Sequence, residues 1–248
     1  MNSAINHTAI KFREDRYGGI IIDDSTVHQP LEVLEENLLK TISKQADKNL
    51  MWITLPIGKS SYIPLFTRHG FNFYDCSENS ITLFKRLTHN SVTPTATNHT
   101  IGVGAFVRDG DDILVVKDRL YKKYKLPGGY IDNEENISQT IEREVFEETG
   151  IHVTLESIVS IGHFSPGQFN ESNLYIVCNA KPLSKTINVN DSQEIIEAKW
   201  INIDEYLGSR EIHPYNKKIV TTALQGRGIK LEINDFFATE NSRHEFFF

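Results

Sequence analysis

Residues 128–151 read GGYIDNEENISQTIEREVFEETGI. The second half of this stretch predicts a helix of about three turns, because no Pro or Gly interrupts residues 139–149 and Gly150 is a typical helix terminator. Either Asn136 or Ser138 can act as the N-cap. Apolar residues recur every four positions and predict the buried side of the helix: Ile137, Ile141 and Val145.

One face of this predicted helix is acidic. Glu144, Glu147 and Glu148 stand at i, i+3 and i+4, which places them within about 100° of one another around the helix axis. Carboxylates this close raise one another's pKa and destabilise the site unless a cation neutralises them. Their hard oxygen atoms suit Mg²⁺ or Mn²⁺. The cluster predicts a metal site, whereas EVFEE taken alone is also typical of a solvated helix face.

The segment in front of the helix predicts a close approach of the backbone to a ligand. Residues 125–129 read KLPGG, which indicates a strand that ends in a loop. Two successive glycines leave the backbone without side chains. The carbonyl group of Gly128 could then face a metal ion.

From Gly129 onward the stretch fits the pattern G-x5-E-x7-R-E-U-x-E-E-x-G-U at every fixed position, where U is apolar. In this respect the chain resembles the Nudix hydrolases. The resemblance implies a metal site made by the Gly128 carbonyl and the carboxylates of Glu144, Glu147 and Glu148. It also implies that Arg143 orients these glutamates by charge-assisted hydrogen bonds, and that Glu135 supports them from the loop.

Composition limits the class of protein. With 248 residues, 39% of them apolar and 24% charged, the chain is typical of a globular protein with two modest domains. The net charge of −7 argues against nonspecific binding to nucleic acid, which needs clustered Lys and Arg. No apolar run approaches the length of a membrane span, and the polar N-terminus lacks a signal-peptide core. We therefore expect a cytoplasmic protein that does not bind membranes.

The two cysteines, Cys76 and Cys178, lie far apart in the sequence and in no CxxC motif. We expect both to be buried thiols. A polar stretch from Thr88 to Asn98 indicates a linker. The expected organisation is an N-terminal domain, a linker, a Nudix domain and a C-terminal tail that either docks or frays, at residues 1–90, 91–98, 99–230 and 231–248.

The N-terminal part predicts a small α/β domain. Its apolar runs indicate strands and helices at 17–22, 31–42, 50–55, 60–69, 71–74 and 81–87. It resembles the acetyltransferase-like (GNAT) domain that precedes the Nudix domain in plant ADP-ribose/NADH pyrophosphatases and in an animal growth-factor-antisense relative. The resemblance rests on DRYGGI at 15–20, on the W-x-x-L-P-I run at 52–57 and on RHGF at 68–71. Residues 56–61 do not provide the Gly-rich loop of an acetyl-CoA site, so we expect no transferase activity. Trp52 is expected in the core, and this domain could serve as a dimerisation surface in a homodimer.

The second part predicts the Nudix fold. Residues 101–107 and 113–117 read as a hairpin closed by Asp109-Gly110. Further strands are expected at 153–161, 174–180 and 198–203, and a helix at 217–224. This order resembles the α/β/α Nudix sandwich. The expected fold class is therefore an α/β/α sandwich with a mixed sheet, preceded by a small GNAT-like α/β domain.

The resemblance implies metal-dependent hydrolysis of the pyrophosphate bond of a small nucleoside-diphosphate compound. The motif leaves the general base open. Glu144 is the first candidate. Glu194 is the second, because QEIIEAKW at 193–200 is similar to the Q-E-I-x-x-A-K-W segment of the plant enzymes. Glu171 is the third, and for both loop residues an exposed carboxylate is the alternative.

Pro166 lies fifteen residues beyond Ile151, a distance at which a proline is associated with Nudix enzymes that hydrolyse ADP-ribose. A turn proline is also an ordinary structural feature. The SQPWPFPxS array of one NADH-hydrolysing branch is absent, although the plant enzymes hydrolyse NADH without it. We expect ADP-ribose as substrate, with NADH as a second. Alternatives are CoA, a nucleotide sugar, a dinucleoside polyphosphate or a nucleoside triphosphate, or a non-catalytic nucleotide sensor, which would usually have lost a glutamate of the motif.

Overall fold

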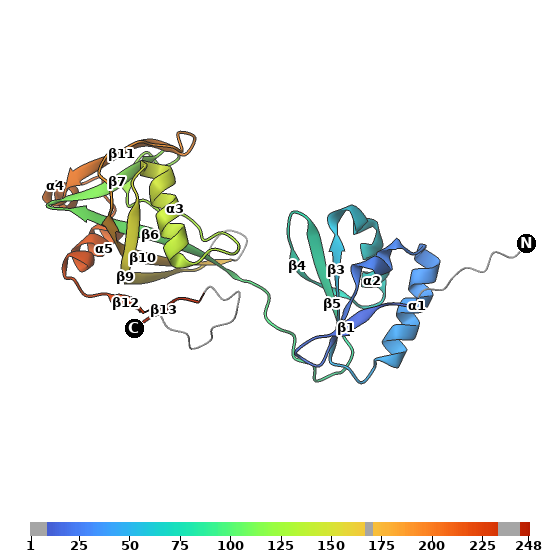
Figure 1. Cartoon of the computed structure of the whole chain (residues 1–248). Coiled ribbons are helices and arrows are strands. Elements are labelled where there is room, and N and C mark those ends of the chain that lie inside the picture. Colours follow the sequence, from blue (N-terminus) through green and yellow to red (C-terminus); the bar gives the residue numbers. More distant parts are fainter. Residues whose placement is uncertain (1–8, 167–170, 233–243) are drawn as a thin grey trace, which may run out of the picture. The chain divides into compact units, whose positions relative to one another are not determined.

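We describe residues 9–166, 171–232 and 244–248 in a computed structural model of the chain. The chain forms two compact units, residues 1–97 and residues 98–248. Each unit has its own sheet and its own apolar core, and its own set of helices (Figure 1).

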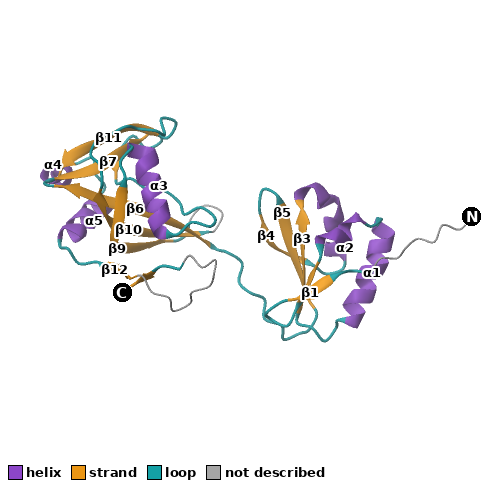
Figure 2. Cartoon of the chain, viewed as in Figure 1, coloured by secondary structure: helices purple, strands orange, loops and turns teal. Residues whose placement is uncertain are grey.

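The N-terminal unit is a five-stranded sheet with helices packed on one face. The strand order is β1-β2-β3-β5-β4, with β2 and β3 parallel and the other pairs antiparallel. The strands are β1 (Phe12–Glu14), β2 (Ile20–Ile22), β3 (Leu50–Pro56), β4 (Asn72–Cys76) and β5 (Ser80–Arg86). The helices are α1 (Leu31–Lys44) and α2 (Ile63–Arg68), with 3-10 turns η1 (Asp24–His28) and η2 (Ile57–Tyr62) (Figure 2). The single helix predicted from residue 60 is thus a 3-10 turn followed by a shorter α-helix.

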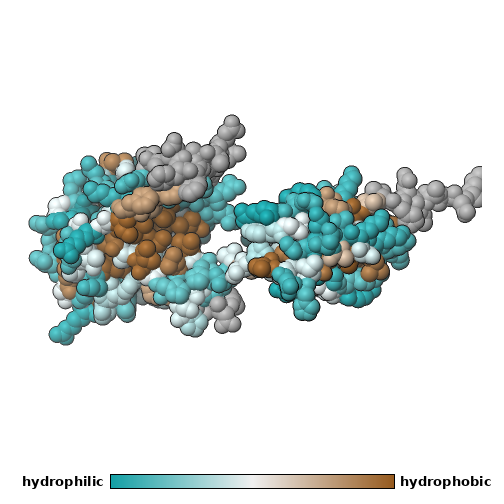
Figure 3. All heavy atoms as spheres, turned by 90° about the horizontal axis from the view of Figure 1, so that it is seen from below, coloured by the Kyte–Doolittle hydropathy of each residue, from teal (hydrophilic) through white to brown (hydrophobic). Residues whose placement is uncertain are grey.

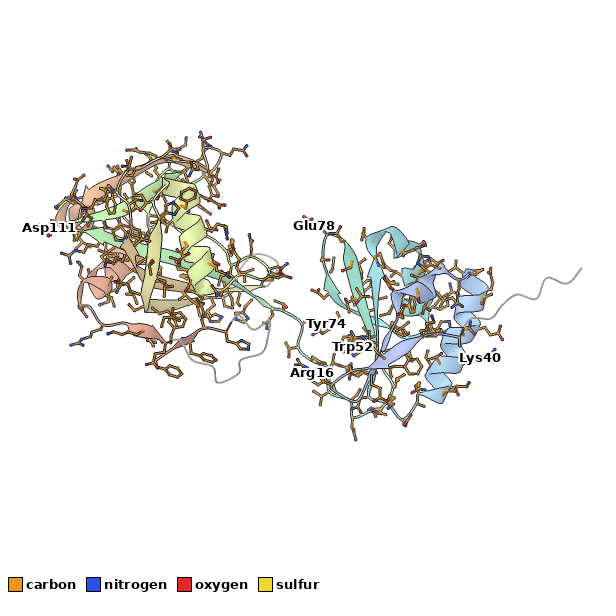
Figure 4. All side chains as sticks on the ribbon, in the orientation of Figure 1. Arg16, Lys40, Trp52, Tyr74, Glu78 and Asp111 are labelled. Carbon is orange, nitrogen blue, oxygen red and sulfur yellow. The ribbon has the colours of Figure 1, made fainter. Side chains whose placement is uncertain are left out.

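Trp52 belongs to an aromatic cluster of the N-terminal unit. Its ring lies edge-on to Tyr74, with 4.9 Å between the ring centroids (Figure 4). The ring of Phe84 lies beside it, with 5.5 Å between the centroids. The indole Nε1–H donates to a carboxylate oxygen of Asp15 at 2.9 Å. Trp52 is only 9% exposed, which confirms the prediction that it is a core residue.

The cysteine prediction is half right. Cys178 is buried, but Cys76 is exposed. Cys76 ends β4, which is one of the two edge strands of the sheet, so β4 has a neighbouring strand on one side only. The edge position depends on how the strands pair, which a thiol's usual preference for burial cannot reveal.

The C-terminal unit has an eight-stranded sheet in the order β11-β7-β6-β10-β9-β12-β13, with β8 paired to β7. The strands are β6 (His99–Asp109), β7 (Asp112–Asp118), β8 (Tyr124–Lys125), β9 (Val153–Phe164), β10 (Ser172–Pro182), β11 (Ile195–Asn202), β12 (Ile229–Glu232) and β13 (Phe246–Phe247). β6 and β10 are parallel, and the other pairs are antiparallel. The sheet is therefore mixed.

Helices cover both faces of this sheet. α3 (Ile137–Thr149) packs on one face, where it shares a core with β6, β9 and β10. α4 (Ile203–Gly208) and α5 (Pro214–Leu224) pack on the other face. Three layers result, which confirms the predicted α/β/α sandwich (Figure 1).

The ends of α3 have the chemistry that its sequence predicts. Asn136 is the N-cap, and its side chain and that of Gln139 form a reciprocal capping box. At the other end Gly150 adopts a left-handed conformation with φ of 73°. Ile141 and Val145 are fully buried. Of the two possible caps, the structure therefore selects Asn136 over Ser138.

The hairpin of β6 and β7 opens beyond its turn. Only two residue pairs join the strands directly, Arg108 with Ile113 and Asp109 with Asp112. Residues 124–131 fill the opening: β8 pairs with β7, and the backbone at 127–131 bonds to β6. The amide of Val103, for example, donates to the carbonyl of Gly129 at 2.8 Å. The two glycines in front of α3 are thereby held by the sheet.

Apolar side chains gather on one face of the C-terminal unit, seen from below in Figure 3. Strands β9 and β12 and the C-terminal residue expose Ile161, Ile229 and Phe248. None of the helices in the described part of the chain has the length and hydropathy that a membrane crossing requires. A homodimer formed through the N-terminal unit remains a prediction.

Removing residues 1–90 is expected to leave a folded C-terminal unit with measurable hydrolase activity. Both apolar cores of that unit are built from residues beyond position 102. Circular dichroism and an activity assay on the shortened chain, beside the full chain, check this. An unfolded fragment would contradict the expected domain boundary.

Candidate active site

Arg143 lies at the centre of the first group of charged side chains. It donates two hydrogen bonds to the carboxylate of Glu135, at 2.7 and 2.8 Å. Its other terminal nitrogen donates to Glu144 at 2.8 Å and to Glu147 at 3.2 Å. The hydrogen bonds from Arg143 lower the pKa of Glu135 to about 2, and those to Glu135 raise the pKa of Arg143. One guanidinium group therefore orients three carboxylates.

Glu148 lies deeper than the other two acidic residues of α3. Its side chain is 4% exposed, compared with 15% for Glu144 and 50% for Glu147. One carboxylate oxygen accepts the amide hydrogen of Gly128 at 2.7 Å. Burial raises the pKa of Glu148 to about 8, although the charge of Lys125 and the Gly128 amide oppose this shift.

Lys125 is the centre of a second group of charges. Its Nζ lies 3.7 Å from Asp118, 4.0 Å from Glu148 and 3.9 Å from Glu194. Asp118 is buried, while the Glu194 side chain is 60% exposed. The sequence reasoning found neither Lys125 nor Asp118 as a site residue. The only available signal was the position of Lys125 two residues before Pro127 in the KLPGG segment.

Glu144 couples the two groups electrostatically. Burial raises the pKa of Glu144, the hydrogen bond from Arg143 opposes the rise, and the negative charges of Glu147 and Glu194 add to it. Glu194 also raises the pKa of Glu148. Glu144, Glu148 and Glu194 are therefore close enough to interact electrostatically.

The glycines pass unusually close to this cluster. A Cβ atom added to Gly129 would lie 2.6 Å from the carboxyl carbon of Glu144. Gly128 has a φ of 145°, and a Cβ there would collide with the carbonyl of Val103. Only glycine fits at Gly128 without strain, and only a residue without a side chain lets Glu144 lie against position 129.

The donor atoms suit a hard divalent cation. Carboxylate oxygens and a backbone carbonyl are the ligands that Mg²⁺ and Mn²⁺ prefer. As the side chains stand, the described residues include no group of three His, Cys, Asp or Glu placed to hold a metal ion. The reason is visible in the contacts, since Arg143 holds Glu144 and Glu147 while Gly128 and Lys125 hold Glu148.

Of the other three predicted site residues, the structure brings only Glu194 to the charged cluster. Glu194 joins the cluster, and its backbone carbonyl accepts the amide of Arg119 at 2.8 Å. Glu171 is exposed, and within the described ranges it has no hydrogen bond or ion pair. Pro166 is exposed and follows a cis peptide bond after Ser165. Residues 167–170 next to it lie outside the described part.

Tyr175 is a further residue that the sequence reasoning missed. Its ring lies across Gly102 and Gly104 of the neighbouring strand, where an added Cβ at Gly102 would come within 2.9 Å of the ring. Burial raises its pKa, and the charge of Glu148 adds to the rise. Two glycines in a strand thus make room for a tyrosine beside the acidic cluster.

A family model described as the NUDIX domain matches residues 98–223. This range contains both charged groups and all three layers of the sandwich. The chain belongs to the Nudix hydrolase family. A second Nudix model, described as the Nudix hydrolase domain, matches residues 10–87. The N-terminal unit thus has a Nudix match of its own, and its likeness to acetyltransferases remains a prediction.

Curated Nudix proteins align with most of the chain. Human "Nucleoside diphosphate-linked moiety X motif 6" is 32% identical over 225 residues, which cover 86% of this chain and 71% of that protein. "Nudix hydrolase 8" of Arabidopsis thaliana is 28% identical over 218 residues, covering 84% and 59% respectively. These relatives confirm the resemblance and identify the chain as a Nudix pyrophosphohydrolase, a family that generally uses divalent metal ions.

Among solved structures, a Nudix hydrolase from Nitrosomonas europaea matches 56% of this chain and 97% of its own, with 24% identity and a TM-score of 0.49.

Proposed function

We propose that this Nudix hydrolase cleaves the pyrophosphate bond of ADP-ribose, and NADH as a second substrate, with Mg²⁺ or Mn²⁺. The observation that carries the chemistry is that Glu144 lies against Gly129 and Glu148 accepts from the Gly128 amide, while Lys125 lies within 4.0 Å of both Glu148 and Glu194. Several carboxylates at a point of close backbone approach suit metal-assisted attack on a diphosphate.

The proposed metal ligands are the Gly128 carbonyl and the carboxylates of Glu144, Glu147 and Glu148. When bound there, divalent metal would neutralise charge on the diphosphate oxygens and lower the pKa of a water molecule. Arg143 keeps the Glu144 and Glu147 side chains oriented, with Glu135 as its anchor.

The proposed general base is Glu144, with Glu194 as the second candidate. Glu144 is largely buried and its pKa is raised, which brings its proton affinity closer to that needed to accept a proton near neutral pH. Glu194 is more exposed, but Lys125 keeps it beside Glu148. Glu171 has no such partner among the described residues and is the weakest of the three.

Two observations support the substrate. Pro166 stands fifteen residues after the motif, and the human relative is named for a nucleoside-diphosphate-linked moiety. Another nucleotide substrate is the nearest alternative. A sensor without activity is the other, and the presence of every acidic residue of the motif argues against it.

Incubation with ADP-ribose and Mg²⁺ or Mn²⁺ is expected to give AMP and ribose 5-phosphate. NADH should give AMP and reduced nicotinamide mononucleotide. In ¹⁸O-water the solvent oxygen forms the new P–O bond at one phosphorus, and the bridging oxygen leaves with the other phosphate. The motif offers no Ser, Cys or His nucleophile beside its carboxylates, so no covalent phospho-enzyme is expected.

Mass spectrometry of the two products should therefore find label in one phosphate only. Label in neither would contradict direct hydrolysis. No AMP from ADP-ribose at any metal concentration would contradict the substrate, and a panel of CoA, nucleotide sugars, dinucleoside polyphosphates and nucleoside triphosphates would then identify the alternative.

A further inference from the structure

The C-terminal residues 244–248 dock on the catalytic unit. β13 pairs with β12, so that Phe247 lies opposite Leu231, and both side chains pack against the core that contains α3. Phe248 and Lys230 exchange two backbone hydrogen bonds of 2.9 and 3.0 Å. Of the two expected fates of the tail, docking applies to this end of it.

Because β13 pairs with β12, the side chain of Glu245 lies at the first turn of α3. Its carboxylate accepts the amide hydrogen of Ile137 at 2.8 Å and that of Ser138 at 3.1 Å. The amides of a first helical turn have no partners within the helix. Asn136 satisfies the amide of Gln139, so Glu245 supplies the acceptors that the local sequence does not.

The contact joins distant parts of the chain at a functional position. Glu245 is 108 residues from Ile137 in the sequence. Directly before the helix start lies Glu135, which holds Arg143 by two hydrogen bonds, and Arg143 in turn holds Glu144. If the start of α3 moves, Glu135 moves with it, and the hydrogen bonds that hold Arg143 are disturbed.

We propose that Glu245 is a positioning residue of the active site, which fixes the start of the catalytic helix and thereby the Glu135–Arg143–Glu144 contacts. This inference rests on the proposed function, because its consequence is measured as turnover. A negative group at a helix N-terminus also interacts favourably with the helix dipole. Residues 244–248 thus help to hold the first turn of α3 in place.

The test compares Glu245→Ala and Glu245→Gln with the control Glu232→Gln in the full chain. Glu232 is an exposed carboxylate on β12, opposite Phe246. We expect kcat to fall about threefold to tenfold for Glu245→Ala, because a displaced Glu135–Arg143–Glu144 chain misplaces a catalytic carboxylate, and less for Glu245→Gln, which keeps one acceptor oxygen. KM should change less than twofold, and Glu232→Gln should behave as wild type.

Amide hydrogen exchange tests the contact between Glu245 and α3 without any substrate. The amides of Ile137 and Ser138 should exchange faster in Glu245→Ala than in wild type or in Glu232→Gln, with the centre of α3 unchanged. A chain that lacks residues 244–248 should reproduce both effects.

Three results would overturn the inference. Unchanged exchange at Ile137 and Ser138 would show that the contact does not form. Faster exchange with wild-type kcat would show that it does not position the site. A loss of kcat in the shortened chain that Glu245→Ala does not reproduce would assign the effect to the phenylalanines. Wild-type protein inactive on every nucleotide would instead overturn the proposed function, while the exchange data still report on the contact.

Discussion

Replacing Glu148 with Gln is expected to lower kcat by roughly two or more orders of magnitude, as for the loss of a key electrostatic group. Glu148 is the most buried carboxylate of α3 and contacts both Gly128 and Lys125. Gln keeps the size and can still accept from the Gly128 amide, but it cannot ionise and so cannot supply a negative charge to a bound metal. Glu147→Gln should have a comparable effect on kcat.

Glu142→Gln is the matched control, because Glu142 is an exposed glutamate of the same helix. It should keep wild-type kcat. Activity should also disappear in EDTA and return with Mg²⁺ or Mn²⁺. Without metal, both active-site variants should unfold at a temperature no lower than wild type, because each loses one of several mutually repelling carboxylates. Full activity in EDTA, or in both variants, would contradict the metal site.

Gly129→Ala is expected to lower kcat by roughly one to two orders of magnitude without unfolding the protein. The added methyl group would lie 2.6 Å from the carboxyl carbon of Glu144. Since φ at position 129 lies in a range that other residues adopt, the backbone accepts alanine and the Glu144 side chain must move. The variant therefore displaces a catalytic carboxylate while keeping its charge.

Gly208→Ala is the control for Gly129→Ala, because a methyl group at position 208 meets no atom within 4 Å. Steady-state kinetics and thermal unfolding of both variants separate the two effects. Wild-type kcat in Gly129→Ala would show that the position of Glu144 against this glycine is unimportant for turnover.

The features predicted correctly are those encoded by neighbouring residues. Asn136, the uninterrupted run to Thr149 and Gly150 determine α3 through caps and propensity. The β6–β7 hairpin was also predicted, but its two-residue turn is Gly110-Asp111, one position later than the predicted Asp109-Gly110, because Asp109 still pairs with Asp112. The positions i, i+3 and i+4 place three glutamates on one side of the helix.

The features that were missed depend on contacts between distant residues. Lys125 meets Glu194 only because β8 and β11 both pair with β7. Glu245 reaches Ile137 only because β13 extends the sheet. Cys76 is exposed because of the place of β4 in the strand order. No periodicity or spacing along the chain encodes these pairings.

The insertion of residues 124–131 between β6 and β7 has a consequence for how activity appears during folding. The residues of the candidate active site come from segments at residues 118, 125–129, 144–148 and 194, and they come together only after these strands have paired. Contacts between residues far apart in sequence form slowly, because closing long loops costs chain entropy. Helical circular dichroism should therefore recover before turnover when the denatured enzyme refolds.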